Sequence, residues 1–394
     1  MLRGETTTRS DLDPDRLAAT LQAHGVGRLR GEADLWVVLD GSDPRKPHAR
    51  EMEHLQRVKR LDGPGLVTGY RTLNAIGMGS GGRRGLLYHR LFSSHAPDVV
   101  SEPEETRAAI RSVGAALAPL VADGATVTTI LDSGFDDLAV WAEVWGQGHH
   151  LVCRVHHRDR RVRPAPDAPE CRLADLAPRL RPLAALAEVE AELVVRKTGQ
   201  PRPKLQPVTV TVAATPLVVP YRQDHRTRPD GAGRRRACWL VEVRLGGVDR
   251  PPWWLLTDRP VETAEQAAEV FRMYCQRWAI EDAFKVAKTC LGWEEVQVLG
   301  YDAVRLLVAL GWVATGFLFE LGVTLAWAEV RLLRRLGGGE DRPDRPPGKI
   351  VLARGPRRLL DHLATEAILA EEVRRHGELP PRIAAMLGRS PPAP

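Results

Sequence analysis

The 394-residue sequence has few cysteines, no hydrophobic signal segment and no apolar run suited to crossing a bilayer. Its five cysteines are an odd number without paired spacing, which argues against a disulfide framework and for a reducing compartment. The longest apolar run, Leu306–Val330, contains Glu320 and Glu329, and its charge-free part, Leu306–Phe319, is too short to span a membrane. We therefore expect a cytoplasmic protein that makes no membrane contact, with a buried core helix at this run.

Motifs of several enzyme classes are also missing or out of context. No G-x-S-x-G turn precedes a helix, which excludes the usual nucleophile of the α/β-hydrolases. The segment Gly77–Gly82 matches G-x-G-x-x-G, but a strand-like run follows it, so we predict a flexible turn there. Cys153, His156 and His157 are close in sequence without the spacing that zinc favours, and we expect a structural role for them.

The composition that is present suits a soluble globular protein of two or three domains. Apolar residues make up 43% of the chain and charged residues 27%, and the net charge is +6. Arginine is clustered, as in Arg158–Arg163 and Arg234–Arg236. Such clusters suit a DNA groove, although solvated loops explain them equally well.

Two short apolar runs end in aspartate. Leu35–Leu39 leads to Asp40, and Val127–Leu131 leads to Asp132; each aspartate is followed by a turn sequence. The runs predict buried strands, and the carboxyl end of a central strand is where open sheets place their chemistry. Taken singly, each aspartate is explained as well by capping its own turn.

A long helical pattern, Thr263–Thr289, begins with a capping box of Thr263 and Gln266 and contains no Gly or Pro. It predicts one helix with a polar stripe of Tyr274, Arg277, Glu281, Lys285 and Lys288. The opposite side is apolar and predicts a core-facing surface: Ala279, Ile280, Ala283, Val286 and Ala287. Ion pairs on a solvated face are the plainer explanation of the stripe.

This stripe resembles the Tyr, Arg, Glu, Lys signature of DDE transposases of the insertion-sequence-four family. The resemblance covers roughly residues 35–295 and includes LDGSDPRKP around Asp40 and LDSGFDD around Asp132. It implies an α/β fold: an RNase H-like mixed sheet with flanking helices, interrupted by a β-rich insertion subdomain. In such a fold the first and fourth strands are adjacent and a late helix packs across their ends.

The resemblance also implies the site. Asp40, Asp132 and Glu281 would be the catalytic residues and would bind two Mg²⁺ ions, for which Mn²⁺ substitutes. DNA contacts are implied for five further residues, the last of them holding a flipped base: Tyr274, Arg277, Lys285, Lys288 and Trp239. Ser133 follows Asp132 where relatives often have Arg, which removes one phosphate contact.

The implied function is that of a DNA transposase that cuts and pastes transposon DNA. Water opens the strand at the element's end, and the freed 3′-OH then joins the target. The implied partners are DNA, as transposon ends and target, and a second copy in a homodimeric synaptic complex, with nucleoid association when DNA is bound. Two alternatives remain open: a non-catalytic or truncated derivative that binds transposon DNA, and a host-adapted nuclease. Only 34 residues precede Leu35, where relatives carry a helical DNA-binding domain, which suggests a shortened copy.

Five regions are expected along the chain. A short helical segment at 1–30 precedes the first part of the catalytic core at 31–157. A β-rich insertion follows at 158–252, where Pro, Arg and short β-type runs alternate. The second part of the core occupies 253–336, and a basic tail with a helix occupies 337–394.

Overall fold

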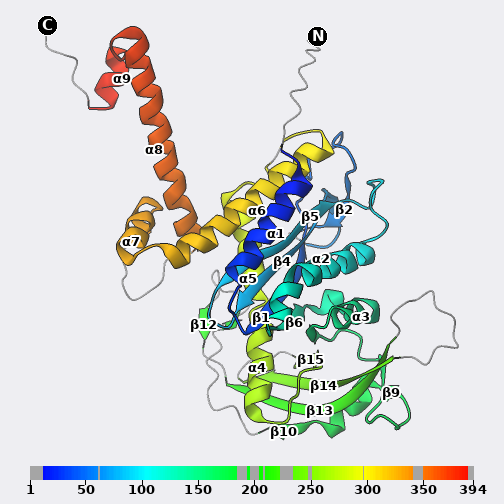
Figure 1. The fold of residues 1–394 in the computed structure, drawn as a ribbon. Coiled ribbons are helices and arrows are strands. Elements are labelled where there is room, and N and C mark those ends of the chain that lie inside the picture. The colour runs from blue at the N-terminus through cyan, green and yellow to red at the C-terminus, as the bar shows by residue number, and fades with distance from the viewer. Residues whose placement is uncertain are drawn as a thin grey trace. The chain divides into compact units, whose positions relative to one another are not determined.

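The computed structural model describes residues 12–60, 63–183, 193–195, 204–206, 209–221, 234–246, 251–295, 297–339 and 349–388. Its centre is a nine-stranded mixed sheet with helices against it, an α/β architecture (Figure 1). The strands in spatial order are β10 (Arg181–Leu183), β13 (Val210–Tyr221), β14 (Arg234–Leu245), β15 (Trp253–Thr257), β7 (His150–Arg154), β6 (Thr126–Leu131), β1 (Asp34–Ser42), β4 (Arg71–Gly79) and β5 (Arg84–Phe92).

The two expected buried strands are neighbours in this sheet. β1 and β6 run parallel, and β6 also runs parallel to β7, while the other described pairings in the sheet are antiparallel. β1 and β6 are the first and fourth strands of the sheet in chain order. The antiparallel strands β4 and β5 form a hairpin, and the turn that joins them lies at the glycine-rich segment, where the sequence predicts a turn.

The strands β10, β13 and β14, which come from the expected insertion at 158–252, extend the same sheet beyond β15. Val210–Tyr221 is one continuous strand, although the sequence shows two short β-type runs there. Three two-stranded sheets complete the β-structure of the described residues: β2 (Gln56–Lys59) with β3 (Leu66–Gly69), β8 (Arg161–Val162) with β9 (Cys171–Arg172), and β11 (Leu193–Val195) with β12 (Lys204–Gln206).

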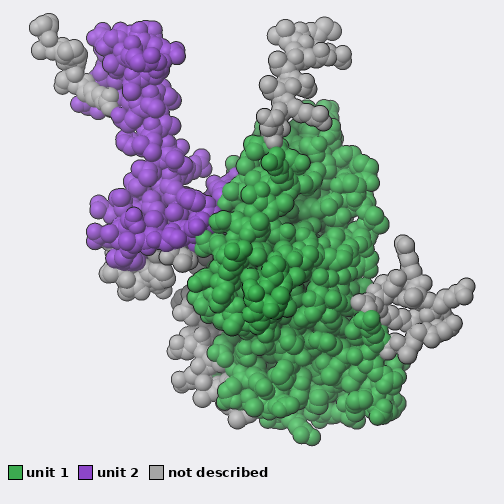
Figure 2. Space-filling view, viewed as in Figure 1, with its two compact units in different colours: residues 1–284, 293–313 green, residues 285–292, 314–394 purple. Residues whose placement is uncertain are grey.

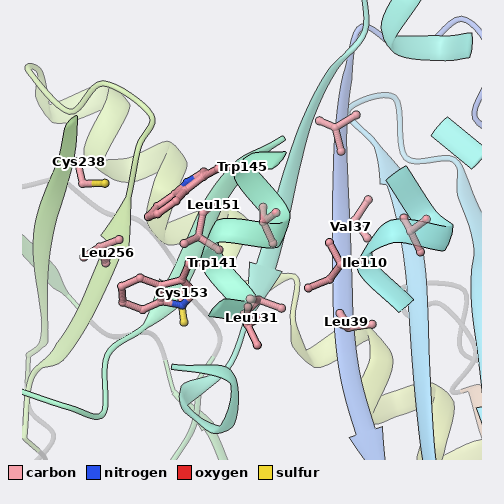
Figure 3. Close-up of a cluster of buried hydrophobic side chains, with 14 of the residues drawn as sticks. Val37, Leu39, Ile110, Leu131, Trp141, Trp145, Leu151, Cys153, Cys238 and Leu256 are labelled. Carbon is pink, nitrogen blue, oxygen red and sulfur yellow. The ribbon is translucent and has the colours of Figure 1, made fainter. Parts of the chain in front are cut away.

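One face of the sheet packs against α2 (Glu102–Ala122) and α3 (Leu138–Gly146). Figure 3 shows Val37 and Leu39 of β1 beside Ile110 of α2, and Trp141 of α3 beside Cys153 of β7. Alternate residues of a strand point to opposite faces, so Val38 and Asp40 belong to the other face. The helix α1 (Pro14–Arg28) packs against β5, where Gly25 has no room for a Cβ because the carbonyl of Leu86 lies 2.0 Å from its position.

The other face is covered by helices from later in the chain, α4 (Ala264–Cys275), α5 (Trp278–Cys290) and the first part of α6 (Tyr301–Thr324). The capping box at Thr263 and Gln266 forms as expected. The apolar side of α5 is buried as expected: Ala279, Ile280, Ala283, Val286 and Ala287 are all less than 9% exposed.

The expectation of one uninterrupted helix from Thr263 is wrong. α4 ends at Cys275, and a turn at Gln276 and Arg277 precedes α5. Good helix formers occupy the turn, so local propensity does not explain it. The side chain of Arg277 forms ion pairs there, and the ring of Trp278 packs edge-on against Trp253 at 6.2 Å. Tertiary contacts therefore outweigh propensity at this position.

The expected core helix of residues 302–336 is two helices, α6 and α7 (Trp327–Leu336). Val308 and Trp312 are buried, but Leu310 is 39% exposed and Phe317 52% exposed, so burial on all sides is wrong. Residues 301–321 of α6 are long and apolar enough to cross a membrane, with mean hydropathy 1.7 and 28% of the window buried. Among the described residues α6 alone passes this test, which core helices of soluble proteins pass as well.

The chain divides into two compact units (Figure 2). Unit 1 comprises residues 1–284 and 293–313 and contains the nine-stranded sheet. Unit 2 comprises residues 285–292 and 314–394, and its described helices include α7, α8 (Lys349–His376) and α9 (Pro381–Met386). Within unit 2 the start of α8 packs closely against α7, since the carbonyl of Leu333 lies 2.3 Å from where Gly355 would carry a Cβ.

Candidate active site

Asp40 and Asp132 both lie near the ends of two adjacent parallel strands. The register of β1 and β6 pairs Val38 with Ile130, and two positions further are Asp40, still within β1, and Asp132, the residue that follows β6. Side chains two positions apart along a strand point to the same face, so the side chains of Asp40 and Asp132 point to the face of Val38 and Ile130. Adjacent strands are about 4.8 Å apart. Asp132 is close enough to Asp40 for its charge to raise the Asp40 pKa.

The same register extends the pair into a row of polar residues across five strands, which we call the polar row. Asp40 pairs with Asn74 on β4, and Asn74 pairs with His89 on β5. In the other direction the pairing of β6 with β7 ends at Leu131 and Cys153, and the next residues are Asp132, just beyond β6, and Arg154, the last residue of β7. The polar row is thus Arg154, Asp132, Asp40, Asn74 and His89.

Asp40 is the most perturbed carboxyl of the polar row. Burial and the negative charge of Asp132, with a smaller contribution from Glu281, raise its pKa to about 7 against the lowering effect of Arg277 and of the Gly41 N–H. The Gly41 N–H donates to Asp40 Oδ1 at 2.8 Å. Asp132 accepts from the Gly134 N–H at 2.7 Å and so caps the turn that follows it. The turn expected directly after Asp40 is wrong, because β1 continues through Gly41 and Ser42, which pair with β4. Strongly raised carboxyl pKa values are common at catalytic sites and are rare on open surfaces.

Arg277 connects the strands to α5. Its Nη1 is 3.3 Å from Asp40 Oδ2 and 2.5 Å from Glu281 Oε1. The side chain of Asp40 is 15% exposed and that of Arg277 13%, whereas Glu281 is 51% exposed. Glu281 therefore reaches the aspartates through a guanidinium group rather than by direct burial beside them.

Tyr274 lies on the last turn of α4, just before the junction with α5. The expectation that it belongs to a polar stripe on the helix surface is wrong. It is 4% exposed, its ring meets Trp253 at 5.6 Å between centroids, and its side chain hydrogen-bonds with Arg154. Burial raises the Tyr274 pKa, with a smaller raising effect from Asp132. Tyr274 thus interacts with both Arg154 and Asp132, as Arg277 does with Asp40 and Glu281.

The remaining residues expected at the site are placed as follows. Lys285 and Lys288 lie on the later turns of α5 and belong to unit 2. Trp239 on β14 is half-buried and pairs with Thr257, which pairs with Val152, so it shares the sheet face of Arg154 from two strands away. Trp253 and Trp254 are buried within the sheet.

The donor set of the site suits a hard divalent cation in its chemistry, because Mg²⁺ prefers carboxylate oxygen, water and phosphate. Asp40 and Asp132 present two carboxylates from adjacent strands, and Glu281 is exposed beside them. Among the described residues, however, no group of three or more His, Cys, Asp or Glu side chains is gathered closely enough to hold an ion. Arg277 forms the ion pairs with Asp40 and Glu281 that a shared metal cation would otherwise form.

Sequence reasoning missed two residues under the site, Asn74 and His89. His89 Nδ1 is 2.6 Å from Asn74 Oδ1, and Asn74 Nδ2 donates to Thr72 Oγ1 at 3.1 Å. Burial lowers the His89 pKa to about 3, so the ring is neutral and Nδ1 carries the proton that it donates to Asn74. Asn74 and His89 are polar residues within the largely apolar strands β4 and β5. This interruption of an apolar pattern was the signal by which the sequence could have identified them.

Asp136 was also missed as a structural anchor. Its Oδ2 accepts from the backbone N–H groups of His156 and His157 at 2.6 Å, and its Oδ1 pairs with Arg160 at 2.5 Å. The Arg160 guanidinium lies 4.2 Å above the ring of Trp141. These contacts fasten the turn after Asp132 to the end of β7, and they give part of the Arg158–Arg163 cluster a structural role.

Lys46, in the LDGSDPRKP segment, is 5% exposed. Its Nζ donates to the carbonyl oxygens of Trp293 at 3.2 Å and Glu294 at 2.8 Å, which ties the loop after β1 to the segment after α5. It lines a cavity of about 480 Å³ together with Glu294 and Leu299. We assign it a structural role in holding that loop.

Comparison with known proteins adds no relative. No protein family model matches the chain, and no curated protein matches it. The geometry of the polar row and of the α4–α5 junction therefore carries the functional interpretation.

Proposed function

We propose that this chain is a DNA transposase of the DDE type, which hydrolyses a phosphodiester bond at a transposon end and joins the freed strand to target DNA. One observation carries the proposal: Asp40 on β1 and Asp132 just beyond the adjacent parallel strand β6 are near each other, with Asp132 and Glu281 both close enough to raise the Asp40 pKa. The arrangement of β1 beside β6, with a later helix across their ends, supports an RNase H-like core.

Asp40, Asp132 and Glu281 would hold the divalent ions. When bound, Mg²⁺ would supply Lewis-acid stabilisation of the phosphate and lower the pKa of water. A cation beside Asp40 favours its ionised form, which burial alone disfavours at neutral pH. Binding of the ions requires Glu281 to leave Arg277, which its 51% exposure permits.

The cations around the carboxylates would position DNA. Arg277, once released from Glu281, and Arg154, which is held by Tyr274 next to Asp132, would donate to phosphate oxygens on either side of the carboxylates. Lys285 and Lys288 would contact the DNA backbone further along α5. Trp239, on the same sheet face as Arg154, would stack on an unpaired base. In the synaptic complex the protein would act as a homodimer in the cytoplasm, on the nucleoid.

The test is Mg²⁺-dependent nicking of DNA taken from either end of the element that carries this reading frame. Glu281→Gln should abolish nicking and keep DNA binding, because it removes a metal ligand and leaves the cations in place. Asp282→Asn is the matched control, since it removes a neighbouring exposed charge on the same helix and should nick normally.

Nicking by the Glu281→Gln variant at the wild-type rate would show that Glu281 is not a catalytic residue. Specific binding of the ends by the wild type without any nicking, in Mg²⁺ or in Mn²⁺, would instead identify a DNA-binding derivative of a transposase.

A further inference from the structure

A chain of hydrogen bonds joins β1, β4 and β5 beneath the carboxylates, and a backbone carbonyl fixes its direction. Thr72 Oγ1 donates its single proton to the carbonyl oxygen of Ser42 at 3.1 Å. Thr72 can therefore only accept from Asn74, so the atom of Asn74 that lies 3.1 Å from Thr72 Oγ1 is the amide nitrogen. Asn74 Oδ1 then faces His89 Nδ1 at 2.6 Å, and His89 is the donor. The orientation of the Asn74 amide is thus determined from both ends.

The amide nitrogen of Asn74 carries a second proton. Asn74 is 0% exposed, and among the described residues Thr72 is the one hydrogen-bond acceptor of this nitrogen. A buried N–H group that has no acceptor is destabilising, and native proteins contain few of them. The second proton therefore indicates an acceptor that Asn74 gains in another state of the site.

Asp40 is in position to be that acceptor. The register pairs Asp40 directly with Asn74, and directly opposite residues on one face have Cβ atoms about 4.5–5.5 Å apart. In this structure Asp40 Oδ1 accepts from the Gly41 N–H at 2.8 Å, and Oδ2 contacts Arg277 at 3.3 Å. Arg277 has to release Oδ2 before a divalent cation can bind there. Asn74 then offers a buried donor to the carboxylate from the neighbouring strand.

His89 is held in place by two tryptophans. The centroid of its ring lies 5.9 Å from the ring of Trp293 and 5.9 Å from the ring of Trp312, whose plane is inclined by only 25°. Among the described residues Nε2 has no hydrogen-bond partner, so the bond to Asn74 is the one hydrogen bond that the side chain makes. The ring is fixed by packing, and its single N–H is directed at Asn74.

We propose that Asn74 is a positioning residue of the active site, which donates its second amide proton to Asp40 and so orients the carboxylate for a divalent cation, and that His89 sets the orientation of the Asn74 amide. The inference rests on the proposed function, because it assigns Asn74 a role in holding Asp40 for the cation. Hydrogen-bond partners of metal-binding side chains contribute about 10–100-fold to metal affinity or activity.

The first experiment measures the affinity of the DNA-free full chain for Mn²⁺ by titration calorimetry. Asn74→Leu removes the amide at similar volume and should weaken Mn²⁺ binding by about tenfold or more. Thr129→Val is the matched control. It also replaces a buried polar side chain by an apolar one, but Thr129 pairs with Val37 and so belongs to the opposite face of the sheet. The control should bind Mn²⁺ as the wild type does.

The outcomes separate this inference from the proposed function. Equal Mn²⁺ affinity of the wild type and Asn74→Leu would overturn the positioning role and leave the proposed function standing. An equal loss in Thr129→Val would also overturn the positioning role, because the loss would then follow from any buried polar exchange. A wild type that binds no Mn²⁺ would overturn the proposed function and the inference together.

The second experiment compares two substitutions of His89 that remove different parts of the side chain. His89→Phe keeps an aromatic ring between the tryptophans and removes the donor, whereas His89→Asn keeps an N–H near the place of Nδ1 and removes the ring. A positioning role predicts that His89→Phe loses about tenfold in Mn²⁺ affinity and that His89→Asn keeps most of it. Urea unfolding should give the reverse order, because His89→Asn loses the ring packing. If Mn²⁺ affinity followed stability instead, with His89→Asn the weaker binder, His89 would only pack the core and its proposed role would be overturned.

Discussion

The two sides of the candidate active site are built differently. On the strand side, Asp40 and Asp132 are positioned by the register of β1 and β6 and by hydrogen bonds from the N–H groups of Gly41 and Gly134. On the helix side, Glu281 is half-exposed and forms an ion pair with Arg277. The strand side is therefore preorganised, and the helix side is adjustable. A cation that binds between them would rearrange the helix side and leave the strand side in place.

The largest effect should come from the strand side, through the raised pKa of Asp40. An aspartate whose pKa rises from 3.8 unfolded to about 7 folded stabilises the fold only while protonated, so stability falls as the pH rises from about 4 to about 7. Asp40→Asn removes this cost. The variant should exceed the wild type by up to about 4 kcal/mol at pH 8, and the two should converge near pH 4.

Urea unfolding without divalent cations, at several pH values, measures this difference. Mg²⁺ should stabilise the wild type at pH 8 and not the variant. A constant difference across the pH range would mean that Asp40 ionises normally, and the contrast between the two sides would be lost.

A smaller effect should come from the helix side. Arg277→Ala removes the group that competes with a cation for Asp40 and Glu281, so the affinity for Mn²⁺ should rise by about tenfold. Titration calorimetry of the DNA-free protein measures it, with Arg83→Ala, an exposed arginine at the β4–β5 turn, as the control. Unchanged Mn²⁺ affinity would show that Arg277 does not guard the carboxylates.

The smallest effect should appear in the salt dependence of DNA binding. Lys288→Ala should reduce the slope of log K against log salt by about one, because one phosphate contact is lost. Arg277→Ala should reduce it by a similar amount only with divalent cation present, since without it the guanidinium stays paired with the two carboxylates. Equal slopes for the wild type and Lys288→Ala would show that the DNA does not contact the later turns of α5.

Much of the strand side could be predicted because its information is local. The apolar runs before Asp40 and Asp132 are short-range patterns, and both strands form at them, although β1 continues two residues beyond Asp40. The buried side of α5 was predictable for the same reason, since its period of 3.6 residues is written in consecutive positions. The break before α5 was not predictable, because residues 276 and 277 are good helix formers and the contacts of Arg277 come from β1.

The sequence alone determined the α/β alternation, the two acidic strand ends and the apolar side of the helix that carries Glu281, because hydrophobic periodicity and capping act within a few residues. Tertiary structure alone decided the polar row, the place of Arg154 beside Asp132 and the role of Arg277 between two carboxylates. Register between strands depends on residues far apart in the chain, and no local pattern specifies which of them face one another.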